Sequence, residues 1–199
     1  MTLVTLTRYA QIEQALEHRR QLAGFTLVEL LITVVVLCIL LALAVPAYRS
    51  FMQNDQQWTQ QNNLVLSLNT ARSEAIKDDL PGGVQVCSST DGATCTGTPW
   101  GSGWIVLPSV NVFAAAPPKP LQVVGALPTG TTLTEANNNL TVTFLSNGAL
   151  APVPAPIAFK MCDVRGAAFA RYTQVTLMGR VVASPTVGQD LTGAALTCP

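Results

Sequence analysis

A long apolar run near the N-terminus limits what this chain can fold into more than any other feature. Residues 25–47, FTLVELLITVVVLCILLALAVPA, contain a single charged residue, Glu29. A helix needs about 20 mostly apolar residues to cross the hydrocarbon core of a bilayer, so this run is long enough to span one. The whole chain has 199 residues, which allows one domain with an appendage and leaves little room for two full cores.

Three interpretations of the apolar run differ in its fate after export. A cleaved secretory signal would use residues 45–47 as its cleavage site, but the run is longer than the usual apolar region of about 7–15 residues. A lipoprotein signal would use Cys38, but residues 35–37 lack the small side chains expected before a lipidated cysteine. A retained membrane helix fits best. The His-Arg-Arg sequence at residues 18–20 then keeps the preceding end in the cytoplasm and sends the C-terminal part outward.

The helical pattern continues beyond Pro46, but with a polar face. Small and apolar side chains recur there at spacings of four, three and four residues: Leu64, Leu68, Ala71 and Ala75. This spacing predicts an amphipathic helix that packs onto a domain. One long helix is therefore expected over about residues 25–77, ending at Pro81-Gly82-Gly83.

The remainder of the chain has the composition of a β-rich domain. Short runs rich in Val, Ile, Thr and Phe are expected strands: Val84–Cys87, Trp104–Leu107, Leu121–Val124, Leu140–Leu145, Ala158–Cys162, Val175–Leu177 and Arg180–Ala183. Asn147-Gly148 after one of them predicts a hairpin turn, since this pair tolerates positive φ angles. Proline-rich residues 114–120 and 151–156 predict surface loops or edge segments. A long helix followed by a mostly antiparallel sheet is an α+β fold.

The start of the apolar run carries a short and specific motif. The residues from Gly24 through Phe25 to Glu29, GFTLVE, follow a basic leader, and together they resemble the type IV prepilin motif. The resemblance implies that a prepilin peptidase cuts between Gly24 and Phe25 on the cytoplasmic side and methylates the new amine of Phe25. Only glycine fits well before such a cut, because a side chain would obstruct close approach of the backbone.

The same resemblance divides the chain into four parts. Residues 1–24 would be a cleaved leader, and residues 25–47 a transmembrane and assembly helix. Residues 48–80 would continue the helix in amphipathic form, and residues 81–199 would form a β-rich pilin head. The mature chain would then cross the inner membrane once, with its head in the periplasm, and enter a pilus or pseudopilus.

Glu29 is an unusual residue in this setting. A carboxylate within a membrane helix costs about 2.5–3.5 kcal/mol on insertion scales, so it is functional by default. One interpretation is structural, with Glu29 close enough to the helix end to reach the interface. The other is that Glu29 pairs with the freed ammonium of Phe25, on its own or a neighbouring chain, and so sets the register of a new subunit. Pro46 lies where pilins often carry a helix-kinking proline.

The cysteines fit an exported domain. Cys38 lies in the apolar run and is expected to act as a small apolar filler. The other four, Cys87, Cys95, Cys162 and Cys198, are an even number in the exported part, which suggests two disulfides. We favour Cys87–Cys95, closing a turn-rich loop, and Cys162–Cys198, tying down the C-terminus. A zinc site is the alternative, but no CxxC occurs and the one histidine, His18, would leave with the leader.

The helix and the head carry a finer resemblance. Its segments are Ala71–Ile76, Val84–Cys87, Trp100, Gly103–Val106, Phe144 with Gly148, and Met178–Val182. They resemble the minor pilins and pseudopilins of the FimT/GspH family. The resemblance implies a low-abundance subunit near a filament tip that helps to start or cap assembly together with other major and minor pilins or pseudopilins. It leaves open whether the filament is a type IV pilus or a type II secretion pseudopilus.

DNA uptake is the alternative function within this family. Some FimT proteins bind DNA through a Gly-Arg-x-Arg motif near the C-terminus. This chain has Gly179 and Arg180, but Val182 stands in place of the second arginine. A group of basic residues is nevertheless present: Lys160, Arg165, Arg171 and Arg180. Such residues could bind phosphate without sequence specificity, or they could simply be solvated charges.

Other function classes have little support in the sequence. The formal net charge is zero, so the whole chain gives no electrostatic indication of a nucleic-acid partner. Without the leader no histidine remains to act as a general base, and no nucleophile, phosphate-loop or metal-ligand motif occurs. Trp100 and Trp104 could form a ligand platform or could pack in the core. We therefore expect no enzyme activity, no cofactor and no metal.

Overall fold

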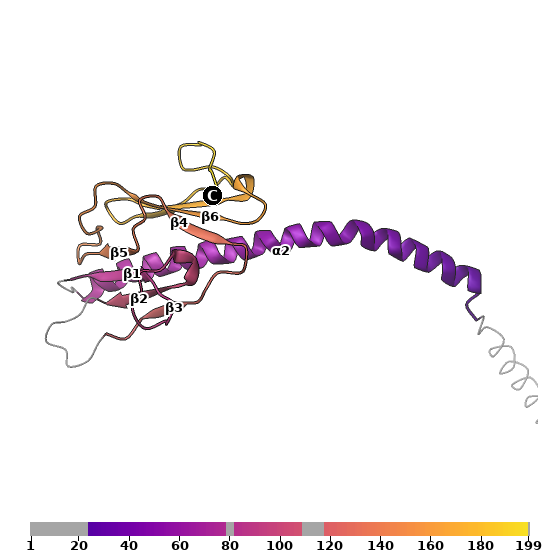
Figure 1. Cartoon of the computed structure of the whole chain (residues 1–199), viewed down its shortest axis with the longest axis horizontal. Helices are drawn as coiled ribbons and strands as arrows, with labels where there is room; N and C mark the ends of the chain where they lie inside the picture. Colours follow the sequence, from indigo (N-terminus) through magenta and orange to yellow (C-terminus); the bar gives the residue numbers. More distant parts are fainter. Residues whose placement is uncertain (1–23, 79–81, 109–117, 199) are drawn as a thin grey trace, which may run out of the picture. The chain divides into compact units, whose positions relative to one another are not determined.

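A computed structural model describes residues 24–78, 82–108 and 118–198 (Figure 1). Three predicted features lie wholly or partly outside these ranges: residues 1–23 of the leader, Pro81 of the helix stop and residues 114–117 of the first proline-rich stretch. The chain separates into two compact units, residues 1–52 and residues 53–199. Each unit is described by itself below.

A single helix, α2 (Leu27–Asp78), begins in the first unit and ends in the second. Thr26 caps its N-terminus, since the Oγ1 of Thr26 accepts a hydrogen bond from the N–H of Glu29 at 3.2 Å. Pro46 lies inside the helix. The prediction of one helix over about residues 25–77 is thus confirmed to within two residues at each end.

Within the described residues of the second unit, eight strands form two antiparallel sheets. The first sheet has the order β3-β2-β1-β5, with β1 (Val84–Ser88), β2 (Trp104–Pro108), β3 (Gln122–Val124) and β5 (Thr141–Phe144). The second has the order β4-β6-β7-β8, with β4 (Thr132–Glu135), β6 (Ile157–Cys162), β7 (Arg171–Val175) and β8 (Val181–Ala183). Two short 3-10 helices, η2 (Trp100–Ser102) and η3 (Ala167–Phe169), precede β2 and β7. The expected α+β fold is confirmed.

The strand predictions were wrong at two places in the second sheet. Strand β4 was missed, because TLTE has a single apolar residue, Leu133, to signal burial. Strand β7 was expected at residues 175–177 but occupies residues 171–175. The reason is that β7 turns Arg171 and Thr173 inward together with Val175. A search for apolar alternation cannot detect a strand whose buried face is largely polar.

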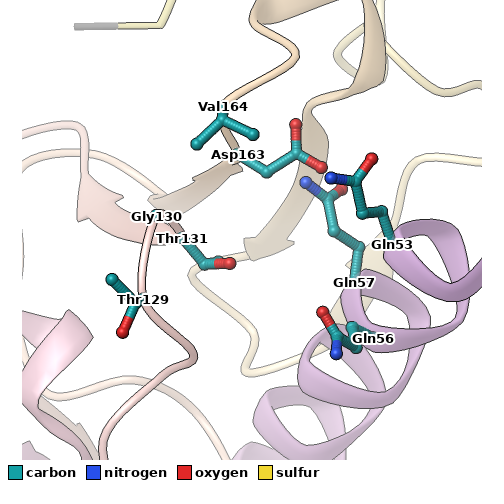
Figure 2. Close-up of a pocket in the computed structure, with 8 residues that line it drawn as sticks. All are labelled: Gln53, Gln56, Gln57, Thr129, Gly130, Thr131, Asp163 and Val164. Atoms are coloured by element: carbon teal, nitrogen blue, oxygen red, sulfur yellow. The ribbon is translucent and has the colours of Figure 1, made fainter. Parts of the chain in front are cut away.

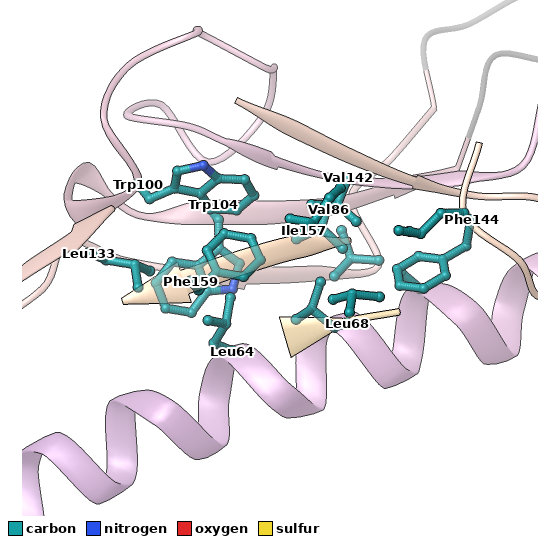
Figure 3. Packing of buried hydrophobic residues seen from close by; sticks show 14 of the residues in the cluster. Leu64, Leu68, Val86, Trp100, Trp104, Leu133, Val142, Phe144, Ile157 and Phe159 are labelled. Atoms are coloured by element: carbon teal, nitrogen blue, oxygen red, sulfur yellow. The ribbon is translucent and has the colours of Figure 1, made fainter. Parts of the chain in front are cut away.

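The core lies between α2 and the two sheets (Figure 3). Leu64 and Leu68 of the helix are 1% and 0% exposed. They meet the side chains of both sheets and of the loops, among them Val86, Trp104, Val142, Phe144, Ile157 and Phe159. Because each buried leucine or isoleucine is worth about 1.5–3 kcal/mol, this shared core is what holds helix and sheets together.

Polar contacts fix the helix at defined positions along the sheets. The Oγ of Ser67 accepts a hydrogen bond from the indole N–H of Trp104 at 2.9 Å. The side-chain amide of Gln61 donates to the carbonyl of Tyr172 and to the hydroxyl of Thr173. Buried polar groups with partners specify one arrangement more sharply than apolar contacts alone. The helix therefore has one register against the head.

Two glycines bring distant loops together beside the helix. Gly179 has a φ of 73°, and a Cβ there would collide with the carbonyl oxygen of Gly148. That same carbonyl accepts a hydrogen bond from the Nε of Arg72 at 3.0 Å. Gly179 is thus needed for close approach of two backbones. This structural requirement accounts for the glycine of the Gly179-Arg180 pair independently of any ligand.

The four head cysteines form two disulfides in the structure, Cys87–Cys95 and Cys162–Cys198. This is the pairing that the sequence analysis favours. The first closes a loop organised by Asp91, whose carboxylate accepts hydrogen bonds from Ser89, Ala93 and Thr94. The side-chain hydrogen bond from Thr94, followed by the backbone ones, lowers the pKa of Asp91 below its ordinary value.

Candidate functional site

The first part of α2 presents an apolar surface that the described chain does not cover. Every large apolar side chain from Leu27 to Val45 is at least 46% exposed. By length and composition this stretch could cross a membrane, with a mean hydropathy of 3.0. Exposed apolar surface this extensive marks contact with a membrane or with another protein. The function of this part of the chain therefore depends on what covers it.

Glu29 lies in the first turn of this apolar helix. Its spacing from Thr26 is that of a capping box, in which a threonine and a glutamate three residues later satisfy the first turn of a helix. The backbone of Glu29 makes the expected bond to Thr26. Within the described residues its carboxylate has no ion-pair partner. The proposed partner, the free amine of Phe25, cannot exist while Phe25 is still bonded to Gly24.

Gly24 stands next to Phe25 in open space. A Cβ built on Gly24 meets nothing within 4 Å, and its φ is not in the left-handed region. By contrast, a Cβ on Gly179 or Gly103 would meet backbone atoms of neighbouring loops. Nothing within the described chain therefore requires glycine at position 24.

The predicted basic residues do not form one patch, and Arg165 is already paired. Its Nη2 lies 2.6 Å from the Oδ2 of Asp163, and its Nη1 donates to the side-chain oxygen of Asn54 at 2.7 Å. Its guanidinium also lies 4.3 Å from the centroid of the Phe169 ring. Arg165 is therefore a structural ion pair rather than an available cation.

Arg171 lies on the helix-facing side of β7. It is 7% exposed, and its guanidinium carbon lies 4.1 Å from the centroid of the Trp58 ring of α2. Burial, and to a lesser extent the positive charge of Arg165, lowers the pKa of Arg171. An open groove of about 330 Å³ is lined by Asn54, Trp58, Ala168, Phe169, Arg171 and Val187.

Lys160 and Arg180 lie elsewhere on the second sheet. Lys160 is directly opposite Tyr172 in the β6–β7 register, whereas Arg171 is one residue away on β7 and so faces the other side of the sheet. The Nζ of Lys160 lies 3.4 Å from the hydroxyl of Thr197 in the C-terminal segment. Arg180 is exposed in the turn between β7 and β8. The structure therefore does not gather these cations on one surface.

A small polar cleft lies between α2 and the loops beside the two sheets (Figure 2). It measures about 50 Å³ and is lined by Gln53, Gln56, Gln57, Thr129, Gly130, Thr131, Asp163 and Val164. Gln57 is 3% exposed, and neither atom of its amide has a hydrogen-bond partner within the described residues. The cleft has room for a water molecule that can bond to this amide.

The two tryptophans proposed as a possible ligand platform are core residues. Trp100 and Trp104 are 2% and 0% exposed. Trp100 packs edge-on against Phe159, with ring centroids 4.9 Å apart, and donates to the carbonyl of Asn139. The third tryptophan, Trp58, is 49% exposed instead, and the sequence analysis did not single it out. Its signal was an aromatic side chain within the polar run QQWTQQ.

Residues 60–179 match the protein family described as Type II transport protein GspH. This match covers more than half of the chain. The chain belongs to the GspH family. Residues 19–45 also match the prokaryotic N-terminal methylation motif, which covers Gly24, Phe25 and Glu29. The predicted membership among minor pilins and pseudopilins is thus confirmed.

Solved structures of pilin-like proteins resemble this GspH-family chain. The type IV minor pilin FimU of Pseudomonas aeruginosa aligns with a TM-score of 0.53 and 23% identity, over 68% of this chain and 92% of FimU. The minor pseudopilin EpsH from the Type 2 Secretion System of Vibrio cholerae aligns with a TM-score of 0.45 and 13% identity, over 65% of this chain and 96% of EpsH. No curated protein has a sequence that matches the chain. The likeness to FimU supports the pilin-like fold.

Proposed function

We propose that this GspH-family chain is a minor subunit that helps to start or cap a type IV pilus or a type II secretion pseudopilus. The observation that carries the proposal is the division of α2. Its first part exposes apolar side chains all round, whereas its second part holds a folded head. A chain built in this way can enter a bundle of apolar helices while it displays its head outside, as subunits of a helical filament must.

The proposal includes processing at the start of the helix. A prepilin peptidase cuts between Gly24 and Phe25 and methylates the new amine, and the inner membrane holds residues 25–47 with the head in the periplasm. The match to the methylation motif supports this step. A glycine at position 24 would let such an enzyme approach the backbone closely.

Glu29 then acts in assembly. Once Phe25 has a free amine, the carboxylate of Glu29 can pair with that amine on its own or a neighbouring subunit. Opposite charges attract strongly in a medium of low dielectric, and separating them there leaves two unpaired charges at a high cost in free energy. The pair therefore favours insertion of a subunit at the one depth where both charges are satisfied.

Two variants test the proposal in the native host. Gly24→Val should leave a precursor that is larger by the mass of residues 1–24, whereas Gly125→Val should be processed normally. Gly125 is a suitable control because a Cβ there also meets nothing within 4 Å. Glu29→Gln should be processed but absent from sheared filaments. Normal processing of Gly24→Val, absence of the unchanged chain from sheared filaments, or normal incorporation of Glu29→Gln would overturn the proposal.

DNA binding is supported less well than assembly. Arg165 is paired with Asp163, Arg171 is buried, and Lys160 and Arg171 lie on opposite faces of their sheet. A salt series of double-stranded DNA binding tests this alternative directly. Tight binding that weakens steeply with salt and is lost in Arg180→Gln would favour DNA uptake.

A further inference from the structure

The guanidinium of Arg171 is a buried cation without an anion. Arg171 is 7% exposed, and its Nε has no hydrogen-bond partner within the described residues. The charged group that acts on the pKa of Arg171 is Arg165, which is also a cation. Asp163 does not compensate Arg171, because it already pairs with Arg165 at 2.6 Å. The Nε is thus removed from water without a partner, which is costly, and no anion within the described residues compensates the positive charge on the wall of the groove, so this arrangement suits an anionic ligand.

The surroundings of Arg171 are those of a protein interface. The groove that it lines has three partly exposed apolar walls: Trp58 at 49%, Phe169 at 38% and Val187 at 40%. Arginine and tryptophan side chains surrounded by apolar groups are typical of residues that dominate binding between proteins. The stacking of Arg171 on Trp58 also holds the guanidinium in place before a partner arrives.

We propose that this groove, the Arg171 groove, receives an aspartate or glutamate side chain from a neighbouring pilin-like subunit. The inference rests on the proposed function, since it needs subunits that pack against one another. A carboxylate suits the site because its two oxygens match the planar fork of a guanidinium. It also supplies the single negative charge that Arg171 lacks, while the apolar walls exclude water from the pair.

A nucleic acid fits the groove less well. Polyphosphate binding gains its affinity from several cations that act together. The groove offers one unpaired cation, since Arg165 is neutralised by Asp163. Lys160 lies on the opposite face of the sheet, across from Tyr172. A single carboxylate therefore matches the available charge.

Site-specific photo-crosslinking of the full-length chain in its native host tests the inference. A photoreactive phenylalanine analogue at Phe169 lies on the wall of the groove. We expect a crosslink to a pilin-like subunit, mapped by mass spectrometry to a segment with an aspartate or glutamate. Arg171→Gln should lower the yield at least about tenfold. Lys119→Gln, which removes one positive charge from an exposed position, should leave the yield unchanged.

Two further variants separate a lost contact from a damaged fold. Val187→Glu places a carboxylate from the chain itself at the rim of the groove, where it should compete with the partner and lower the yield. Arg171→Asp should abolish the crosslink, and changing the mapped acidic residue of the partner to arginine should restore it. An unchanged yield in Arg171→Gln or Val187→Glu would overturn the inference. A crosslink to DNA, or to a segment without acidic residues, would overturn it equally.

A second crosslinker distinguishes failure of this inference from failure of the proposed function. At Leu37, in the exposed apolar part of α2, the same analogue reports packing between helices whatever happens at the groove. Crosslinks at Leu37 without any at Phe169 would overturn the Arg171 groove and leave the filament function standing. Loss of crosslinks at both positions would overturn both.

Discussion

The two parts of α2 are the same secondary structure stabilised in opposite ways. Up to about residue 52, its large apolar side chains are exposed to solvent. Beyond that point, Leu64, Leu68, Ala71 and Ala75 are at most 1% exposed and belong to the core of the head. The first part needs an environment that the chain does not provide. The second part is covered by the core of the head, which the chain itself provides.

The difference lies in how apolar residues are arranged around the helix axis. A helix that is apolar all round has no single face to bury and suits a membrane or a bundle of similar helices. A helix with one apolar stripe packs on one side and leaves the other to water. Substitutions in the second part should therefore change the stability of the head, whereas matched substitutions in the first part should not.

Loss of a disulfide is expected to have the largest effect. Cys162 and Cys198 are 36 residues apart, and closing a loop of that length stabilises a fold by about 4 kcal/mol on the chain-entropy model. The double substitution Cys162→Ser and Cys198→Ser should destabilise the head by about that amount. Cys38→Ser, in the first part of α2, should leave head unfolding unchanged. Urea unfolding of the full chain in detergent, followed by tryptophan fluorescence, measures both.

A core substitution should have the next largest effect. Leu68→Ala removes a fully buried side chain and leaves a cavity, which costs about 2–5 kcal/mol. Leu37→Ala removes the same atoms from a side chain that is 54% exposed, and the midpoint of head unfolding should not move. Equal shifts for the two variants would show that the two parts of the helix are not independent.

A smaller effect is expected where one hydrogen bond is lost. Ser67→Ala leaves the buried indole N–H of Trp104 without its acceptor, which should cost about 1–2 kcal/mol. Thr33→Ala is the matched change, because the hydroxyl of Thr33 bonds to the Leu30 carbonyl on an exposed turn. It should not alter head unfolding. If Ser67→Ala also had no effect on the unfolding midpoint, the hydrogen bond between Trp104 and Ser67 would not help to hold the helix against the head.

The smallest effect is expected at Asp91, and it should depend on pH. Hydrogen bonds from Thr94 and its neighbours lower the pKa of Asp91 in the folded head. Its stabilising contribution is therefore fully present above the ordinary carboxyl pKa near 3.8 and is lost as the pH falls below that value. Asp91→Asn should be less stable than the unchanged chain at pH 7. The difference should shrink at about pH 3; a constant difference would contradict this account.

Local patterns predicted the helix well but the sheets less well. The apolar run and the stripe from Leu64 to Ala75 are signals within the helix itself, so its length followed from them. Most strands were found from runs of β-branched residues. Strand β7 was misplaced because its inward residues include Arg171 and Thr173, which are buried only because Trp58 and Gln61 lie opposite them. The sequence pattern of one strand does not show which side chains of another element will pack against it.

The candidate sites also differ in whether the sequence alone is enough to recognise them. The motif at Gly24, Phe25 and Glu29 is contiguous, so the sequence is enough to recognise it. The basic residues at 160–180 looked like one group because they are close in the sequence. The structure separates them, since neighbouring residues on a strand face opposite sides of a sheet. Only Arg171 is left buried and without an anion.

The sequence by itself determined that this chain has an apolar helix, a processing motif and a disulfide-containing head. The helix and the motif depend on contiguous residues or on a fixed helical period, and the head was predicted from short β-branched runs and an even number of cysteines. The tertiary structure decided which charges are paired. It joined Arg165 to Asp163 and Asn54, and it stacked Arg171 on Trp58. Arg165 and Asp163 are two positions apart, but the contacts of Arg165 with Asn54 and of Arg171 with Trp58 join residues more than 100 positions apart, and only folding brings those together.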